Sequence, residues 1–240
     1  MSVTPETAMI LAAGLGTRLR PITDRLPKPL VTVGGRALID HALDRLVAQG
    51  VRRAVINLHY KGEMIERHLA ARRDIEVCFS PEPQLLDTGG GIRQALPFLG
   101  EVFFALNSDV FWLDGKLPAL ARLARAFDPE RSDALLLLQR TAEAVGYEGP
   151  GDFIVDPAGA IRRRGEREVA AHLFAGIEII HRRLFDNAPP GAFSLNPLWD
   201  RAMAAERLAG LVHDGEWYHV GSPAGLAATE ARLQSHRVER

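Results

Sequence analysis

Short apolar runs alternate with amphipathic stretches along the first 140 residues. The apolar runs have the length of strands buried on both faces, and the stretches between them have the spacing of helices with one apolar face. In the first such helix, Leu38, Ala42 and Leu46 recur on one side. We expect strands at 9–13, 51–58, 75–79, 102–106 and 134–138, and helices at 38–48, 63–71, 92–96 and 117–127. This alternation predicts an α/β fold with a mostly parallel central sheet covered by helices.

The pattern changes after residue 150. We expect a hairpin with strands at 151–155 and 160–163 around a turn at 156–159, followed by a longer strand at 172–180. A helix at 197–208, a strand at 218–220 and a last helix from Pro223 to about residue 233 complete the pattern. We interpret this second half as a small lid subregion on the same sheet, so that residues 1–240 form a single domain.

Composition narrows the class of protein. Apolar residues make up 47% of the 240 residues and charged residues 25%, which is typical of a globular domain with a sizeable core. A formal net charge of −1 gives no electrostatic reason to bind nucleic acid or an anionic membrane, and the basic run at 162–164 is typical of a solvated turn. The single cysteine excludes an internal disulfide. With no signal segment and no apolar run of membrane-spanning length, we expect a cytoplasmic protein.

The segment 11–30 carries the most specific chemistry of the chain. It reads LAAGLGTRLRPITDRLPKPL, so an apolar strand runs into Gly14 and Gly16 and is followed by Arg18 and Lys28. Glycines let a backbone approach phosphates closely, arginine offers a planar fork of donors, and lysine offers a compact charge. The segment lacks the Gly-Lys-Ser/Thr of a P-loop and the third glycine of the dinucleotide fingerprint. It therefore predicts another kind of loop that holds a nucleoside triphosphate.

This segment resembles the signature of the sugar-1-phosphate nucleotidyltransferases, Ala-Ala-Gly-x-Gly-Thr-Arg-Leu-x-Pro-x-Thr followed by Pro-Lys-Pro-Leu. The resemblance implies a Rossmann-like nucleotidyltransferase fold, with a nucleotide-binding half at about 1–140 and a sugar-phosphate-binding half at about 141–240. It also implies the reaction, in which an oxygen of a sugar 1-phosphate attacks the α-phosphorus of a nucleoside triphosphate and pyrophosphate leaves. The expected partners are these two small molecules, and assembly into a homo-oligomer stays open.

The resemblance also implies roles for particular residues. Arg18, Lys28 and Asp109 are the expected catalytic residues. Residues 80–91 are similar to the family's base-recognition loop, and we expect the three glycines at its end to precede a helix and lie flat against the base. The expected nucleotide-binding residues are Leu11, Ala12, Ala13, Gly14, Gly16, Thr17, Arg18, Glu82, Thr88, Gly89 and Asn107. The expected sugar-phosphate-binding residues are Lys28, Gly151 and Gly176.

Asp109 follows a buried strand, at the edge of the sheet where ligands bind in such folds. A carboxylate there is a candidate Mg²⁺ ligand, because Mg²⁺ takes oxygen donors from one or two carboxylates and from substrate phosphates. An Asx-turn that closes the strand is the alternative. The resemblance favours Mg²⁺ as the cofactor, with Asp109 as its ligand.

His219 departs from the family pattern. The second metal carboxylate of the family lies in Trp-x-Asp-x-Gly-Thr, where this chain has Trp217-Tyr218-His219-Val220-Gly221-Ser222. Neutral imidazole is a poor ligand for Mg²⁺. Three interpretations stay open: His219 contacts a water or phosphate of the metal site, Asp214 or Glu216 replaces the missing carboxylate, or His219 is a packing residue.

Within the family, the chain is most similar to the enzymes that uridylylate N-acetylmuramate 1-phosphate in bacterial peptidoglycan recycling. The supporting features are residues 87–92, residues 174–177 and the short tail after Gly221. The similarity implies UTP as the nucleotide substrate. Mannose-1-phosphate guanylyltransferase and glucose-1-phosphate thymidylyl- or uridylyltransferase are the alternatives among enzymes. A nucleotide-sensing regulatory subunit is the alternative of another class, favoured by His219 and opposed by the retained basic residues.

Overall fold

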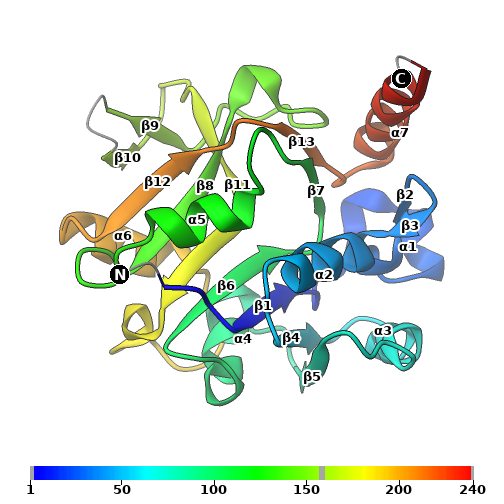
Figure 1. The fold of residues 1–240 in the computed structure, drawn as a ribbon, viewed down its shortest axis with the longest axis horizontal. Coiled ribbons are helices and arrows are strands. Elements are labelled where there is room, and N and C mark those ends of the chain that lie inside the picture. Colours follow the sequence, from blue (N-terminus) through cyan, green and yellow to red (C-terminus); the bar gives the residue numbers. More distant parts are fainter. Residues whose placement is uncertain (1–2, 157–159, 239–240) are drawn as a thin grey trace.

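The computed structural model describes residues 3–156 and 160–238. Its centre is a nine-stranded sheet with the order β10-β9-β11-β6-β1-β4-β5, in which β8 also pairs with β11 and β12 pairs with β8 (Figure 1). The strands are β1 (Thr7–Leu11), β4 (Arg53–Leu58), β5 (Glu76–Pro81), β6 (Val102–Asn107), β8 (Ala134–Arg140), β9 (Phe153–Val155), β10 (Ile161–Arg163), β11 (His172–His181) and β12 (Leu208–Val212). Strands β1, β4, β5 and β6 are mutually parallel, so the predicted α/β class with a mostly parallel sheet is confirmed.

Helices cover both faces of this sheet. One face packs against α2 (Leu38–Ala48), α3 (Gly62–Leu69) and α5 (Ala119–Ala126), and the other packs against α4 (Asp87–Ala95) and α6 (Asn196–Ala204). Successive residues of β1 therefore enter different cores, Ile10 on the first face and Met9 on the second, and both are 0% exposed. This is why β1 reads as a continuous apolar run rather than as an alternating one.

A third, smaller core lies beside the sheet. It joins Leu19, Val33 and Tyr218 and lies among several short elements and the long C-terminal helix. These are α1 (Ile22–Arg25), β2 (Thr32–Val33), β3 (Arg36–Ala37), β7 (Val110–Leu113), β13 (Glu216–His219) and α7 (Pro223–Val238). The hairpin β2–β3 lies under the C-terminal helix in Figure 1. Within the described ranges, no helix is both long enough and apolar enough to cross a bilayer.

The second half of the chain differs most from the sequence prediction. Strand β11 runs antiparallel to both β6 and β8. The helix expected at 197–208 ends at Ala204, and Leu208 begins strand β12 instead. A short buried strand and a helix end cannot be distinguished by periodicity alone, so this boundary was wrong. The sequence pattern also does not predict β7, and part of the expected turn at 156–159, namely 157–159, lies outside the described residues.

Glycines 89–91 lie inside α4 rather than ahead of it, so the expected flat glycine loop is wrong. Each glycine faces a close neighbour. A Cβ on Gly89 would lie 2.4 Å from Cε2 of Phe193, and one on Gly90 would lie 2.5 Å from the carbonyl oxygen of Gly191. A Cβ on Gly91 would lie 2.6 Å from Oε1 of Glu82. The absence of side chains lets these neighbours pack directly on the helix backbone.

Gly91→Ala tests this packing. We expect the added methyl group to lower the free energy of unfolding by about 1–3 kcal/mol, because it collides with Oε1 of Glu82 and Nδ2 of Asn57, which are hydrogen-bonded to each other. Denaturant unfolding measures the change. Gly14→Ala is the control, since a Cβ at Gly14 meets nothing within 4 Å. Equal unfolding midpoints for the Gly91→Ala variant and the unmodified protein would contradict the prediction.

Candidate active site

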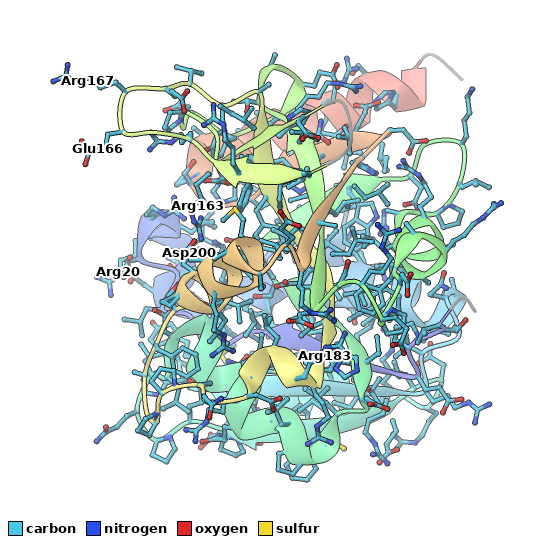
Figure 2. All side chains as sticks on the ribbon, turned by 90° about the vertical axis from the view of Figure 1, so that its left-hand side faces the viewer. Arg20, Arg163, Glu166, Arg167, Arg183 and Asp200 are labelled. Carbon is cyan, nitrogen blue, oxygen red and sulfur yellow. The ribbon has the colours of Figure 1, made fainter. Side chains whose placement is uncertain are left out.

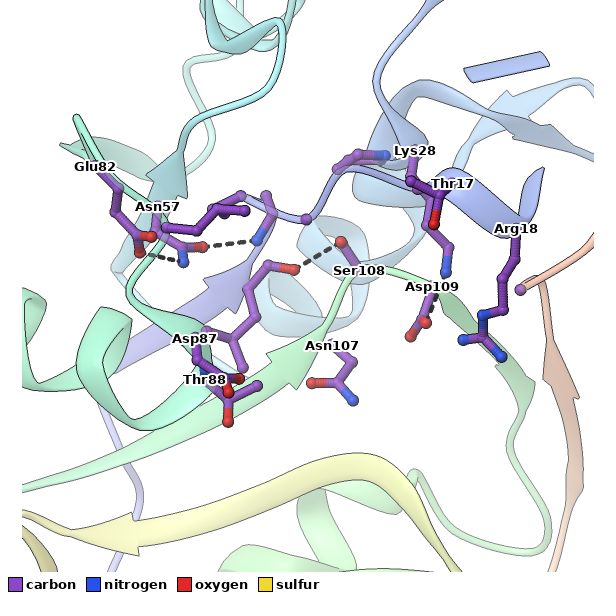
Figure 3. A pocket seen from close by; sticks show the side chains of 18 residues that line it. Thr17, Arg18, Lys28, Asn57, Glu82, Asp87, Thr88, Asn107, Ser108 and Asp109 are labelled. Carbon is purple, nitrogen blue, oxygen red and sulfur yellow. Dashed lines mark hydrogen bonds and ion pairs between the residues drawn. The ribbon is translucent and has the colours of Figure 1, made fainter. Parts of the chain in front are cut away.

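A cleft of about 320 Å³ opens at the carboxyl ends of β1, β4 and β6. Figure 3 shows Asn57 and Glu82 at one end of this cleft and Arg18 and Asp109 at the other. The lining residues are Leu11, Ala12, Ala13, Gly14, Gly16, Thr17, Arg18, Lys28, Pro29, Asn57, Glu82, Leu85, Asp87, Thr88, Asn107, Ser108, Asp109 and Gly221. Nearly all of the residues predicted to bind nucleotide are therefore brought together around one cavity.

Side chains from both neighbouring strands hold the loop that follows β1. The backbone N–H of Ala12 donates to Oδ1 of Asn57 at 2.6 Å, and the hydroxyl of Ser108 donates to the carbonyl oxygen of Leu11 at 2.6 Å. Further along, the hydroxyl of Thr23 donates to the carbonyl oxygen of Gly16 at 2.8 Å. Gly16 has a φ of 63°, which glycine adopts without steric cost. The loop backbone is fixed before any ligand arrives.

Glu82 is only 3% exposed, and both of its carboxylate oxygens are used within the protein. Oε1 accepts a hydrogen bond from Nδ2 of Asn57 at 2.7 Å, and Oε2 accepts one from the backbone N–H of Leu86 at 2.9 Å. Asn57 therefore connects the loop after β1 with the loop that leads to α4. The sequence pattern predicts no role for Asn57, and its position at the end of the second expected strand is the signal that could have indicated this one.

The start of α4 contributes Asp87 and Thr88 to the cleft. Gly89 is not part of the lining, and its backbone N–H donates to the carbonyl oxygen of Phe193 at 2.9 Å. The hydroxyl of Thr88 accepts a hydrogen bond from the backbone N–H of Leu195 at 2.9 Å. These two bonds tie the helix start to the segment before α6, so α4 contributes Thr88 rather than Gly89 to the wall of the cleft.

Asp109, Lys28 and His219 form a charge cluster at the other end of the cleft. Oδ2 of Asp109 pairs with Nζ of Lys28 at 2.7 Å, and Nε2 of His219 lies 3.6 Å from the same oxygen. Burial tends to raise the pKa of Asp109, but His219 and Lys28 together outweigh it and hold that pKa well below its usual range. Asp109 is therefore a carboxylate at neutral pH. Its Oδ1 has no hydrogen-bond partner in the described part of the chain.

Two ring contacts fix His219. It stacks on Trp217, with ring centroids 6.0 Å apart and an angle of 15° between the planes. It also lies against Gly221, where a Cβ would come within 2.4 Å of Cε1 of the imidazole. The absence of a side chain at Gly221 therefore leaves room for the imidazole of His219 beside Asp109.

The alternative metal carboxylates are engaged elsewhere. Asp214 pairs with Arg122 at 2.7 Å. Glu216 accepts a hydrogen bond from the hydroxyl of Tyr218 at 2.6 Å and pairs with Arg232 at 3.1 Å. Neither carboxylate lines the cleft, so the interpretation that one of them replaces the missing family aspartate is wrong.

Arg18 is the exposed cation of the cleft. Its side chain extends towards Asp109 (Figure 3), and it makes neither a hydrogen bond nor an ion pair with any residue in 3–156 or 160–238. Its neighbour Arg20 instead pairs with Asp24 at 3.2 Å on the outer surface. All the guanidinium donors of Arg18 are thus available to an anion that enters the cleft.

A second cavity of about 290 Å³ adjoins the cleft. The two share Leu11, Asp87, Thr88 and Asn107. The remaining lining residues are Asp152, Phe153, Arg163, Phe174, Glu178, Ser194, Leu195, Asn196 and Trp199. The rings of Phe153 and Phe174 meet Trp199 edge-on, with centroids 6.3 and 4.8 Å away. The aromatic rings share this cavity with polar and charged residues, which make up most of its lining, and such a combination suits a polar small molecule.

The glycines predicted to bind the sugar phosphate lie near this second cavity but do not line it. Gly176 has a φ of 74°, and a Cβ there would lie 3.1 Å from Cβ of Asn107. Gly151 has a φ of 77°, and a Cβ there would lie 2.4 Å from the carbonyl oxygen of Ala170. Both positions need glycine for close backbone packing, and Asp152, directly after Gly151, is the residue that reaches the cavity.

Residues 7–149 match the family model described as nucleotidyl transferase. The chain is 44% identical over 239 residues to N-acetylmuramate alpha-1-phosphate uridylyltransferase of Caulobacter vibrioides, with 97% of this chain and 99% of that protein covered. It is 36% identical over 231 residues to the protein of the same name from Neisseria meningitidis, with 93% and 96% covered. The chain belongs to the nucleotidyl transferase family.

Solved structures of low sequence identity share the fold of this nucleotidyltransferase. UDP-glucose pyrophosphorylase, solved in complex with UDP-glucose, aligns with a TM-score of 0.78 at 18% identity over 96% of this chain and 99% of that one. HddC from Yersinia pseudotuberculosis, solved with GMP-PN, aligns with a TM-score of 0.74 at 22% identity over 95% and 99%. At these identities the likeness concerns the fold alone.

Two site residues carry no motif in the sequence. Arg163, interpreted as part of a solvated turn, lines the second cavity and pairs with Asp200 of α6 at 2.5 Å (Figure 2). Glu178 gains its position only because β11 lies between β6 and β8 in the sheet. Such long-range neighbours cannot be read from local sequence patterns.

Arg18→Ala tests the importance of the free cation. We expect kcat/KM to fall by about 10²–10³-fold, because one preorganised charged donor to the developing negative charge is lost. The free energy of unfolding should stay unchanged, since the side chain has no partner in the described residues. Arg20→Ala is the control, because that arginine lies outside the cleft and should leave kcat/KM unaltered. Equal kinetics of the two variants would contradict the assignment.

Proposed function

We propose that this nucleotidyltransferase transfers UMP from UTP to N-acetylmuramate 1-phosphate, giving a UDP-sugar and pyrophosphate, as part of peptidoglycan recycling. The observation that supports it most is the 44% identity over nearly the whole chain to a protein named for that reaction. The second such relative, at 36% identity, supports it independently. Cytoplasmic residence and assembly into a homo-oligomer stay predictions.

In this proposal the triphosphate lies along the loop after β1. Gly14 and Gly16 leave the backbone open to phosphate oxygens, and Arg18 and Lys28 supply positive charge. The base lies towards Asn57 and Glu82, where backbone groups of the 82–88 loop can contact its edge. The sugar occupies the second cavity, so residues 1–140 bind mainly the nucleotide and residues 141–240 mainly the sugar. The cavities' shared wall, which includes Asn107, supports this arrangement.

The reaction requires the protein mainly to position the two substrates. The attacking oxygen of a sugar 1-phosphate is already ionised at neutral pH, so no general base is needed. The residues must hold this oxygen in line with the α-phosphorus and stabilise the charge that develops on the phosphoryl oxygens. Arg18 stabilises the triphosphate, and Lys28 contacts the phosphate nearest the line of attack. When Lys28 contacts this phosphate, it no longer pairs with Asp109, and that carboxylate becomes free for another cation.

The donor set around Asp109 fits Mg²⁺. Oδ1 has no protein partner in the described ranges, the carboxyl is ionised, and the cleft has room for substrate phosphates and waters. Mg²⁺ in sites of this kind is held by one or two carboxylates plus phosphates, so the single carboxylate of Asp109 suffices. When bound, the ion supplies positive charge to the triphosphate oxygens. We propose that His219 contacts a water or phosphate beside the ion rather than the ion itself.

Guanylyl transfer to mannose 1-phosphate is the second candidate. A mannose-1-phosphate guanylyltransferase catalytic subunit from Drosophila pseudoobscura is 30% identical over 226 residues, and this chain covers 59% of its length. Lower identity and the partial coverage make this candidate weaker. A purely regulatory role is disfavoured because Arg18, Lys28 and Asp109 converge in one cleft.

A substrate panel tests the proposed function. Pyrophosphate release should be fastest with UTP and N-acetylmuramate 1-phosphate, and slower with GTP, dTTP, mannose 1-phosphate or glucose 1-phosphate. The measurement is kcat/KM for each pair under one set of conditions. A clear preference for GTP with mannose 1-phosphate would reverse the proposal, and binding of nucleotide without any turnover would favour the regulatory alternative.

Substitutions at Asp109 and His219 test the metal site. We expect Asp109→Asn to abolish Mg²⁺-dependent activity, because the neutral amide binds the ion weakly. His219→Ala should weaken activity less, and His219→Asp should preserve activity and lower the Mg²⁺ concentration that is needed. Mg²⁺ titrations of the three variants, with ligand-free unfolding as the folding control, decide this. An inactive His219→Asp beside an unaffected His219→Ala would make His219 a packing residue.

A further inference from the structure

Glu178 is a buried carboxyl group that the proposed reaction does not use. It lies near the middle of β11, is only 2% exposed, and lines the second cavity. Oε2 accepts a hydrogen bond from Nε1 of Trp199 at 3.1 Å. Oε1 has no hydrogen-bond partner in the described part of the chain. An oxygen of a buried side chain that has no protein partner and lies at the wall of a cavity is free to bind a ligand.

A bulge in β11 brings this side chain to the cavity. Phe174 is opposite Leu138 and Glu178 is opposite Leu136, so four steps along β11 correspond to two along β8. Bulges beside active sites re-aim side chains in this way. The positive φ of Gly176 lies within the bulge. The strand therefore interrupts its regular pairing immediately before the carboxyl group that faces the cavity.

The neighbours of Glu178 favour its neutral form. Its partners across the sheet are Ala105 on β6 and Leu136 on β8, and neither carries charge. Burial raises the pKa of Glu178 to about 8, although the hydrogen bond from Trp199 lowers it. The charged groups that line the same cavity, Asp87, Asp152 and Arg163, each have another partner, which for Asp87 is the backbone N–H of Thr88. Asp152 accepts the N–H of Phe174, and Arg163 pairs with Asp200.

We propose that Glu178 determines the choice of acceptor sugar, by donating a hydrogen bond from its carboxyl group to an oxygen of a ring substituent in the second cavity. The inference rests on the proposed function, since it assigns that cavity to the sugar. With Oε2 accepting from Trp199, the proton is carried on Oε1 and points to the ligand. The recognised group is a carbonyl or carboxylate oxygen, and N-acetylmuramate 1-phosphate carries both, in its N-acetyl and lactyl groups.

Two substitutions separate hydrogen bonding from packing. Glu178→Gln keeps one donor and one acceptor, so the KM for the acceptor sugar should stay within about threefold of the original value. Glu178→Leu removes both at similar volume, and should raise that KM by about 10- to 100-fold while the KM for UTP stays unchanged. Glu101→Gln, on a carboxylate that is 75% exposed and lines neither the cleft nor the second cavity, is the control and should change neither KM.

The acceptor panel identifies the recognised oxygen. N-acetylglucosamine 1-phosphate lacks the lactyl group, and glucose 1-phosphate lacks the N-acetyl group as well. If the lactyl carboxylate is recognised, Glu178→Leu should lower the preference for N-acetylmuramate 1-phosphate over N-acetylglucosamine 1-phosphate. If the N-acetyl carbonyl is recognised, the preference between N-acetylglucosamine 1-phosphate and glucose 1-phosphate should fall instead. Unchanged ratios in both comparisons would overturn the proposal.

The pH dependence gives a second readout that packing alone does not affect. The neutral carboxyl is present below pH about 8 and is lost as the pH rises through that value. The KM for the sugar should therefore rise above that pH in the unmodified protein and stay flat in Glu178→Gln. Parallel pH profiles of the two proteins would contradict a hydrogen-bond donor at this position.

The outcomes distinguish this inference from the proposed function. If the unmodified protein prefers another sugar 1-phosphate, the proposed acceptor is wrong, and the variants are then compared on the preferred one. A selective rise in the KM of that sugar in Glu178→Leu, with rescue in Glu178→Gln, still supports the role of Glu178. An equal rise in the KM for the nucleotide in Glu178→Leu, or a fall in the KM for the sugar in both variants, would overturn the proposed role of Glu178.

Discussion

The site depends on the parallel alignment of β1 between β4 and β6. Because these three strands point the same way, the side chains that follow β4 and β6 reach the loop that follows β1 from opposite sides. Asn57 holds the N–H of Ala12, and Ser108 holds the carbonyl of Leu11, each at 2.6 Å. The first bond gives the N–H of Ala12 its partner beyond the end of the buried strand, and the second adds to the bond at 3.3 Å that the backbone N–H of Ser108 donates to the same carbonyl. The same alignment brings Asp109 within 2.7 Å of Lys28, although 81 residues separate them.

The charged groups of the cleft can exchange ion-pair partners when ligands bind. In the ligand-free protein, Asp109, with 23% of its side chain exposed, pairs with Lys28 at 2.7 Å, and Nε2 of His219 lies 3.6 Å from the same oxygen. An incoming triphosphate offers Lys28 a new anion, and the released carboxylate can then take a metal ion that accompanies the phosphates. Arg18 needs no such exchange, because its donors are free in the described structure. We therefore expect the nucleotide and the ion to bind more tightly together than separately, because the phosphates bind Lys28 and the ion binds the Asp109 carboxylate that Lys28 releases.

The sequence was informative where function depends on a contiguous segment. The loop at 11–18 and Asp109 could be placed together because each follows an apolar strand of a predicted parallel sheet, and Lys28 was assigned from the resemblance to the family signature. Long-range packing was not predictable from local patterns. The three glycines of α4 looked like a loop for a base, yet they serve the contact with the 191–193 segment and Glu82. The sequence pattern indicated a solvated Arg163, but in the fold Asp200 of α6 lies beside it and pairs with it. Glu178 belongs to no motif, and only the antiparallel placement of β11 and its bulge bring it to the second cavity.

The central claim is that one cleft and its adjoining cavity join a nucleotide to a sugar phosphate. Incubation with α-³²P-labelled UTP and N-acetylmuramate 1-phosphate tests this most directly, with the products separated and pyrophosphate measured in the same sample. The account predicts that the label appears in a UDP-sugar in equal amount to the pyrophosphate released, and that this transfer requires Mg²⁺. Label that stays in UTP, or that appears as free UMP without a nucleotide sugar, would contradict it.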